Sequence, residues 1–221
     1  MKNWEKDIVL LNQIGVATFD NIDVEAINYL QNLTDNRENL QNQTDKLAGH
    51  IKDERGLKAT PRFSNYICKL IFENPITNFH LNTIKFLNKN LPIFVDELWI
   101  NFQKKHEFNP IHNHSGVFSF IIFMKIPYNL IDEDKFFPNM KEEPSTSRLC
   151  FIICKPDGGI RDIKCNVDES YLHKMLIFPA NYNHLVYPFF TSDEERITIS
   201  GNIKIDATGV VQILPNKNNN E

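Results

Sequence analysis

The sequence lacks the two features that would direct the chain to a membrane or to nucleic acid. No segment reaches the roughly 18 consecutive apolar residues of a membrane-spanning helix, and the N-terminal stretch MKNWEKDIVLLNQIG is too short and too charged for a signal peptide. No block of Lys and Arg is present, and 24 basic against 28 acidic residues give a net charge of -4. We therefore expect a cytoplasmic protein without a membrane or nucleic-acid partner.

Cysteine is scarce as well. The chain has 4 cysteines, and none of them form a CxxC pair. Free thiols are the usual state of cysteine in a reducing compartment, so we assign no chemistry to these residues. We expect them to be packing residues: Cys68, Cys150, Cys154 and Cys165.

The pattern of apolar residues divides the chain into a helical front and a strand-rich back. Helical spacing predicts helices within residues 21–36 and 74–91, and the polar stretch 36–63 between them suits a long connection or a partial helix. From residue 93 onward, short runs of β-branched and aromatic residues alternate with turn residues. This spacing is typical of a sandwich or jelly roll.

The length favours a single fold unit, because 221 residues can bury one substantial core. We expect an α+β, mainly β domain over residues 1–215, with a helical front at about 1–92, a jelly-roll core at about 93–207 and a disordered tail at 216–221. Within the core, Pro156 to Gly159 should form a hairpin turn. The acidic, proline-bearing stretch 128–147 has no clean period and suggests a long loop or lid.

A short H-x-H motif precedes one of the predicted strands. On an extended segment, residues i and i+2 point to the same face, so His112 and His114 can present both imidazoles to one ion. Alone, the motif more often marks solvent-exposed histidines in a turn. However, His184 opens a short strand about 70 residues later, and a jelly roll can return that strand to the first. We predict a metal site formed by these three histidines.

The strand ERITISGNIKI carries the second signal. Its alternation places Arg196, Thr198, Ser200 and Asn202 on one face and isoleucines on the other. Such a polar face ordinarily points to solvent, but in a jelly roll that holds a polar ligand it lines the cavity while the isoleucines pack under the helices. Arg196 would then offer a planar fork to a carboxylate, with the Thr198 hydroxyl beside it.

Together these elements resemble the 2-oxoglutarate- and Fe(II)-dependent oxygenases, most closely a phage and bacterial branch of that family. The similarity covers residues 93–205 and rests on four elements: Trp99-Ile100-Asn101, HNHSG, FPANYNH and ERITISGNI. The stretch LAGHIKDE in the front half also resembles phage members. The resemblance implies a double-stranded β-helix, an Fe(II) cofactor, 2-oxoglutarate and O2 as cosubstrates, and ascorbate as a further candidate. For a phage-encoded member, the compartment would be the host cytoplasm.

The resemblance also implies roles for single residues. His112 and His184 match the metal-binding histidines, and Arg196 matches the residue that pairs with the distal carboxylate of 2-oxoglutarate. Thr198 matches the accompanying hydroxyl, and Asn101 is a further candidate contact to the cosubstrate. The implied reaction is hydroxylation of a substrate, coupled to conversion of 2-oxoglutarate to succinate and CO2.

One position departs from the family pattern. Most members have H-x-D or H-x-E, whereas here His114 stands in the carboxylate position. Three histidines carry no ligand charge, which should weaken metal retention or change the selectivity among ions that favour imidazole. This departure puts turnover in question, although cupin dioxygenases also use three-histidine iron sites.

Two other functions fit the sequence. A cupin-like metalloenzyme that does not use 2-oxoglutarate would explain the three histidines but would leave Arg196 without a role. In a non-catalytic jelly-roll binding or assembly protein, the histidines would be incidental. The sequence also leaves open the substrate, which could be a protein side chain, a nucleobase or a metabolite, and whether the chain forms a homodimer.

Overall fold

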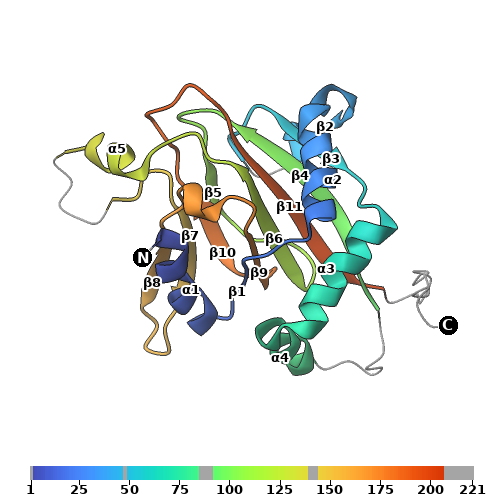
Figure 1. Cartoon of the computed structure of the whole chain (residues 1–221). Coiled ribbons are helices and arrows are strands. Elements are labelled where there is room, and N and C mark those ends of the chain that lie inside the picture. Colours follow the sequence, from blue (N-terminus) through green and yellow to red (C-terminus); the bar gives the residue numbers. More distant parts are fainter. Residues whose placement is uncertain (1, 47–48, 85–91, 139–143, 207–221) are drawn as a thin grey trace.

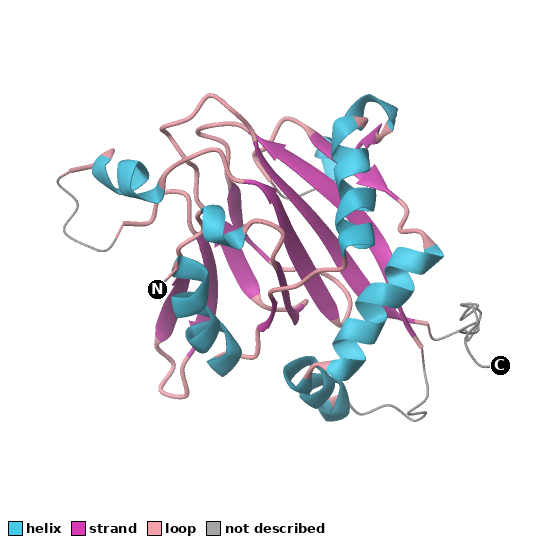
Figure 2. Cartoon of the chain, in the orientation of Figure 1, coloured by secondary structure: helices cyan, strands magenta, loops and turns pink. Residues whose placement is uncertain are grey.

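The computed structural model describes residues 2–46, 49–84, 92–138 and 144–206. Its strands form a seven-stranded and a four-stranded sheet, and every strand pair is antiparallel (Figures 1 and 2). The predicted end of the jelly-roll core at residue 207 and the predicted disordered tail lie outside the described residues.

The larger sheet contains strands from both halves of the chain. In spatial order its strands are β1 (Ala17–Phe19), β9 (Met175–Pro179), β6 (Phe118–Lys125), β11 (Arg196–Ile205), β4 (Ile93–Gln103), β3 (Glu54–Leu57) and β2 (Gln41–Asn42). The smaller sheet is made of β5 (Asn109–His112), β10 (Asn183–Val186), β7 (Leu149–Cys154) and β8 (Ile160–Cys165). In both sheets, strands far apart in sequence are neighbours, as the predicted double-stranded β-helix requires.

Helices flank the sheets. They are α1 (Asn3–Gln13), α2 (Val24–Asp35), α3 (Pro61–Glu73), α4 (Pro75–Thr83) and α5 (Leu130–Lys135), with short 3-10 turns η1 (Arg37–Asn39), η2 (Thr44–Lys46) and η3 (Glu169–Tyr171). Side-chain oxygens of Asp23, Thr60 and Asn74 cap α2, α3 and α4 by accepting backbone N–H bonds. None of the helices in the described parts of the chain is long and apolar enough to cross a membrane.

The structure contains both predicted helices and further helices that were not predicted. The first predicted helix is confirmed as α2. The second is α4, which ends at Thr83, and residues 85–91 lie outside the described residues. The sequence reading missed α1, and it also missed α3 after residue 63. The predicted hairpin is confirmed, because β7 pairs with β8 across the turn at Gly158, whose φ is 81°.

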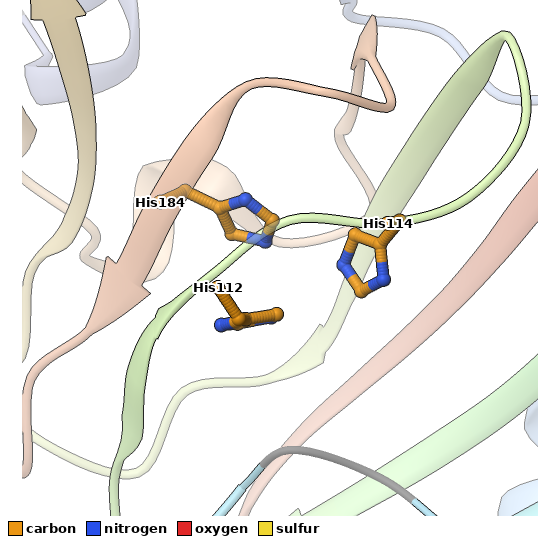
Figure 3. A group of neighbouring side chains, drawn as sticks. All are labelled: His112, His114 and His184. Carbon is orange, nitrogen blue, oxygen red and sulfur yellow. The ribbon is translucent and has the colours of Figure 1, made fainter.

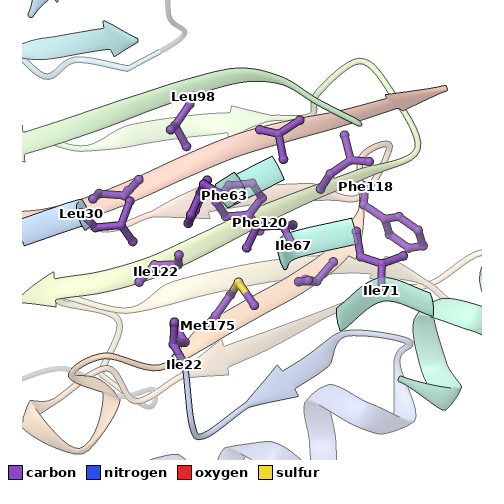
Figure 4. Close-up of a cluster of buried hydrophobic side chains, with 14 of the residues drawn as sticks. Ile22, Leu30, Phe63, Ile67, Ile71, Leu98, Phe118, Phe120, Ile122 and Met175 are labelled. Carbon is purple, nitrogen blue, oxygen red and sulfur yellow. The ribbon is translucent and has the colours of Figure 1, made fainter. Parts of the chain in front are cut away.

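The main core lies between the larger sheet and the helices that cover its outer face (Figure 4). Phe63 and Ile67 of α3 are buried in one cluster with the sheet residues Phe120, Ile199 and Ile203. Full burial of one such side chain stabilises the fold by roughly 1.5–3 kcal/mol. The isoleucine face of β11 therefore packs under the helices, as the alternation predicted. The cysteines Cys68, Cys150 and Cys165 are buried free thiols, whereas Cys154 is exposed.

Gly201 allows β11 and β6 to pack closely in the centre of this core. A Cβ atom at Gly201 would lie 2.6 Å from the ring of Phe120 and 2.7 Å from the backbone oxygen of Glu97. Backbone cannot yield as a flexible side chain can, so Gly201→Ala should reduce the free energy of unfolding by roughly 1–3 kcal/mol in urea titrations. At Gly159, a Cβ would meet mainly the flexible Lys155 side chain, so Gly159→Ala should stay within about 0.5 kcal/mol. Equal stabilities of the two variants would contradict this account.

Candidate active site

Three histidines meet at one end of the smaller sheet (Figure 3). His112 is the last residue of β5, and strand pairing places His184 of β10 directly opposite it. Two residues farther on, the backbone N–H of His114 donates to the carbonyl oxygen of Ala180 at 2.8 Å. The ring centroids are 4.3 to 5.1 Å apart, and one nitrogen of each ring lies within 4.8 Å of the others. The structure thus brings together the three histidines that the sequence singled out.

Backbone carbonyls fix the tautomers of two rings. Nδ1 of His112 lies 2.7 Å from the oxygen of Pro110, and Nδ1 of His184 lies 3.0 Å from the oxygen of Tyr182. A carbonyl oxygen can only accept, so in each ring Nδ1 carries the hydrogen and Nε2 keeps its lone pair. A metal-binding histidine is commonly oriented in this way.

Burial keeps the imidazoles neutral. Desolvation, reinforced by the neighbouring rings, lowers the pKa of His184 to about 3 and that of His114 to about 4. Desolvation also lowers the pKa of His112, against an opposing hydrogen bond to Pro110. Metal coordination requires unprotonated nitrogen, and three neutral imidazoles suit first-row metals such as Fe(II) and Zn(II). The donor set present therefore fits a metal ion.

The histidines open on a cavity of about 780 Å³, to which both sheets contribute residues. Thr198, Ser200 and Asn202 line it from the larger sheet, together with Asn101 on the neighbouring strand β4. The polar face of β11 therefore points inward, as predicted for a jelly roll that holds a polar ligand. This volume is that of a small-molecule site.

Arg196 also lines this cavity, and it is a buried cation whose partners among the described residues are all neutral. Nε and Nη2 donate to Oε1 of Gln103 at 3.0 and 2.6 Å, and Nη1 donates to the hydroxyl of Tyr128 at 3.0 Å. The remaining N–H groups donate to the backbone oxygens of Ser147 and Tyr187. All four acceptors are neutral, and the residue is 3% exposed. Because a buried charge is costly unless an opposite charge balances it, this site favours an anion.

Thr198 and Asn101 lie side by side next to this arginine. Strand pairing places them opposite each other, and Nδ2 of Asn101 donates to Oγ1 of Thr198 at 3.2 Å. Oδ1 of Asn101 has no hydrogen-bond partner in the described structure, although the residue is buried. An unpaired buried acceptor costs about 1–3 kcal/mol, which a bound ligand can recover.

The sequence reading missed three residues of this site. Gln103 and Tyr128 hold Arg196, and Glu54 lines the cavity from β3, between β4 and the edge strand β2. The i, i+2 spacing of Trp99, Asn101 and Gln103 carried a signal for Gln103, whereas the roles of Glu54 and Tyr128 depend on long-range contacts.

The stretch 128–147, expected to be a long loop or a lid, is a loop that does not cover the cavity in its described part. It contains α5, and the carboxylate of Glu133 is fully buried and accepts bonds from the backbone N–H groups of Phe190 and Thr191. None of the described loop residues lines the cavity. The loop acts on the site through Tyr128 and Ser147, which hold Arg196 from behind.

Comparison with known proteins agrees with this geometry. Residues 97–202 match a family model described as "Putative 2OG-Fe(II) oxygenase". The chain carries a 2-oxoglutarate/Fe(II) oxygenase domain. This oxygenase therefore uses Fe(II), with 2-oxoglutarate and O2 as cosubstrates, as the resemblance implied.

Solved structures show the same fold at low identity. A prolyl-4-hydroxylase from Pseudomonas putida is 14% identical, with a TM-score of 0.50 over 90% of this chain and 97% of that one. A 2OG-Fe(II) oxygenase family oxidoreductase from Burkholderia pseudomallei is 12% identical, with a TM-score of 0.52 over 90% and 89%. No curated protein sequence matches the oxygenase.

Glu54 should make the stability of this oxygenase depend on pH. Burial, and next the nearby charge of Glu107, raise the pKa of Glu54 from 4.5 to about 7. A raised carboxyl pKa stabilises the fold at low pH, and that stability is lost as pH rises through about 7. Between pH 5 and pH 8, Glu54→Gln should therefore gain stability relative to the parent by up to roughly 3 kcal/mol in urea titrations. A difference that does not change with pH would contradict the assignment.

Proposed function

We propose that this oxygenase hydroxylates its substrate with the metal held by His112, His114 and His184 and the distal carboxylate of 2-oxoglutarate held by Arg196. One observation carries the proposal. Neutral imidazoles that suit a metal and a buried guanidinium that lacks an anion line the same cavity. A metal-chelating dicarboxylate satisfies both requirements at once. We further propose that the helices and the jelly roll form one domain, since they share one core.

The histidines would hold the metal through fixed nitrogens. The carbonyl oxygens of Pro110 and Tyr182 hold the rings of His112 and His184. These two rings are therefore already oriented before a metal binds. His114 contributes no charge where most relatives have a carboxylate. When bound, Fe(II) together with 2-oxoglutarate supplies the activation of O2 for substrate oxidation, with release of succinate and CO2.

Arg196 would exchange a neutral acceptor for an anionic one. Oε1 of Gln103 accepts from Nε and Nη2 together, which is the side-on position that a carboxylate takes on arginine. A carboxylate displacing this amide oxygen would form stronger, charge-assisted bonds, while Tyr128 and the carbonyl of Ser147 keep the other side of the guanidinium in place. Thr198 then lies next to the carboxylate on the same strand face.

The metal proposal predicts a graded response of iron content. Loaded anaerobically with Fe(II), the parent should retain about one ion per chain. His184→Ala and His114→Ala should lose it, whereas His114→Asp should retain it, because a carboxylate adds a charge that attracts the cation. The exposed His173 provides a matched control, and His173→Ala should retain the parent's iron. Unchanged iron content in His184→Ala would contradict the site.

Succinate release in the same variants tests the reaction. With Fe(II), O2 and ascorbate, the parent and His114→Asp should convert 2-oxoglutarate to succinate, and His114→Ala should not. A parent that binds iron but releases no succinate would favour the cupin-like alternative, in which 2-oxoglutarate is not used.

The proposed contact between Arg196 and the distal carboxylate predicts a loss of affinity for 2-oxoglutarate when Arg196 is replaced. Removing a charge-assisted pair costs about 1.5–3 kcal/mol, so Arg196→Ala should raise the Kd for 2-oxoglutarate by roughly tenfold or more in calorimetric titrations of the Mn(II) form. Arg196→Lys should recover the affinity only in part, because lysine lacks the fork. Arg148 is buried but pairs with Asp134 outside the cavity, so Arg148→Lys should leave the Kd unchanged. Unchanged affinity in both Arg196 variants would make that residue structural.

A further inference from the structure

A row of polar side chains crosses the floor of the cavity toward the edge of the larger sheet. Strand pairing places Thr198 of β11 opposite Asn101 of β4, and Asn101 opposite Glu54 of β3. Residues directly opposite each other project from the same face of a sheet, and all three line the cavity. Glu54 is therefore the outermost member of the row, two strands away from the proposed cosubstrate position.

The carboxylate of Glu54 is buried with one oxygen unpaired among the described residues. It is 1% exposed, and Oε2 has no hydrogen-bond partner in the described part of the chain. Oδ1 of Asn109 lines the same cavity and also has no partner there. Both groups border Gly49, where a Cβ would lie 3.2 Å from Oε1 of Glu54 and 2.1 Å from Oδ1 of Asn109. The Glu54 carboxylate and Oδ1 of Asn109 thus lie on either side of Gly49, where the absence of a side chain lets Asn109 approach.

The cavity holds no cation for this carboxylate. Among its described lining residues, Lys58 and Arg196 carry positive charge, but Lys58 is exposed and Arg196 bonds elsewhere. Burial, and next the like charge of Glu107, instead raise the pKa of Glu54 to about 7. The two other acidic lining residues already have partners, because Asp96 pairs with Lys204 and Glu97 accepts from Asn202.

We propose that the substrate of this oxygenase presents a protonated amine or guanidinium group to Glu54, with Asn109 accepting a further N–H bond. The inference rests on the proposed function, in that the substrate enters the cavity that the three histidines line. A cation would supply both the missing charge and the missing donors, whereas an anionic or purely apolar substrate would leave Glu54 unpaired.

Two pairs of probes of equal shape test the charge. Binding of n-butylguanidinium and its neutral isostere n-butylurea, and of n-butylammonium and n-butanol, is measured by ligand-observed NMR at fixed ionic strength. The protein carries Mn(II) and N-oxalylglycine, an unreactive analogue of 2-oxoglutarate, so that no turnover occurs. The parent should bind at least one cation roughly tenfold more tightly than its neutral isostere.

Two variants assign the preference to one residue. Glu54→Gln keeps the shape of the side chain and should abolish the preference for the cation. Glu97→Gln removes another acid of the same cavity, which already has a partner, and should preserve it. Equal affinity for cation and isostere in both pairs, absence of binding by all four probes, or a preference that survives Glu54→Gln would overturn the proposal.

Binding of N-oxalylglycine to the Mn(II) form, measured before any probe is added, separates this inference from the proposed function. If the parent does not bind N-oxalylglycine, the proposed cosubstrate site is itself wrong. If the parent binds N-oxalylglycine but shows no preference for cationic probes, only the role proposed for Glu54 is wrong.

Discussion

The antiparallel pairing of β11 with β4 determines which side chains face the cavity and which face the helices. Opposite residues share a face, so this one register aligns Arg196 with Gln103 and Thr198 with Asn101. A shift by one residue would turn every polar side chain into the core and every isoleucine into the cavity. The apolar cost of such a shift is large, because Ile199 and Ile203 are fully buried among helix residues. The hydrophobic core therefore holds the polar site in register.

A second pairing completes the metal centre in the same way. β10 lies between β5 and β7, and its register places His184 opposite His112. The two histidines are far apart in sequence, yet the carbonyl oxygens that orient both rings come from residues two positions before each of them. Long-range pairing thus sets the distance between the rings, while local backbone sets their orientation.

The sequence predicted the parts of the site that depend on alternation within one strand. The H-x-H spacing and the polar face that includes Arg196 and Thr198 follow from a period of two, which is visible without a structure. Glu54 was not predictable, because its position depends on how β3 pairs with β4. Tyr128 was missed for a similar reason. Its loop has no period, and its role comes from a tertiary contact with Arg196 rather than from any local pattern.

The cavity contains buried groups that lack a balancing charge or a hydrogen-bond partner among the described residues, and such groups destabilise a protein core unless a ligand pairs with them. Within the described parts of the chain, Arg196 lacks an anion, Glu54 lacks a cation, and Asn101 between them keeps an unpaired oxygen. Arg196 and Glu54 do not neutralise each other, because they extend from β11 and β3 with β4 between them. This separation leaves room for two ligands of opposite character, an anionic one next to Arg196 and a cationic one next to Glu54. Each ligand would relieve a desolvation cost that the empty fold carries, so binding energy would come from charges that the scaffold already holds in place.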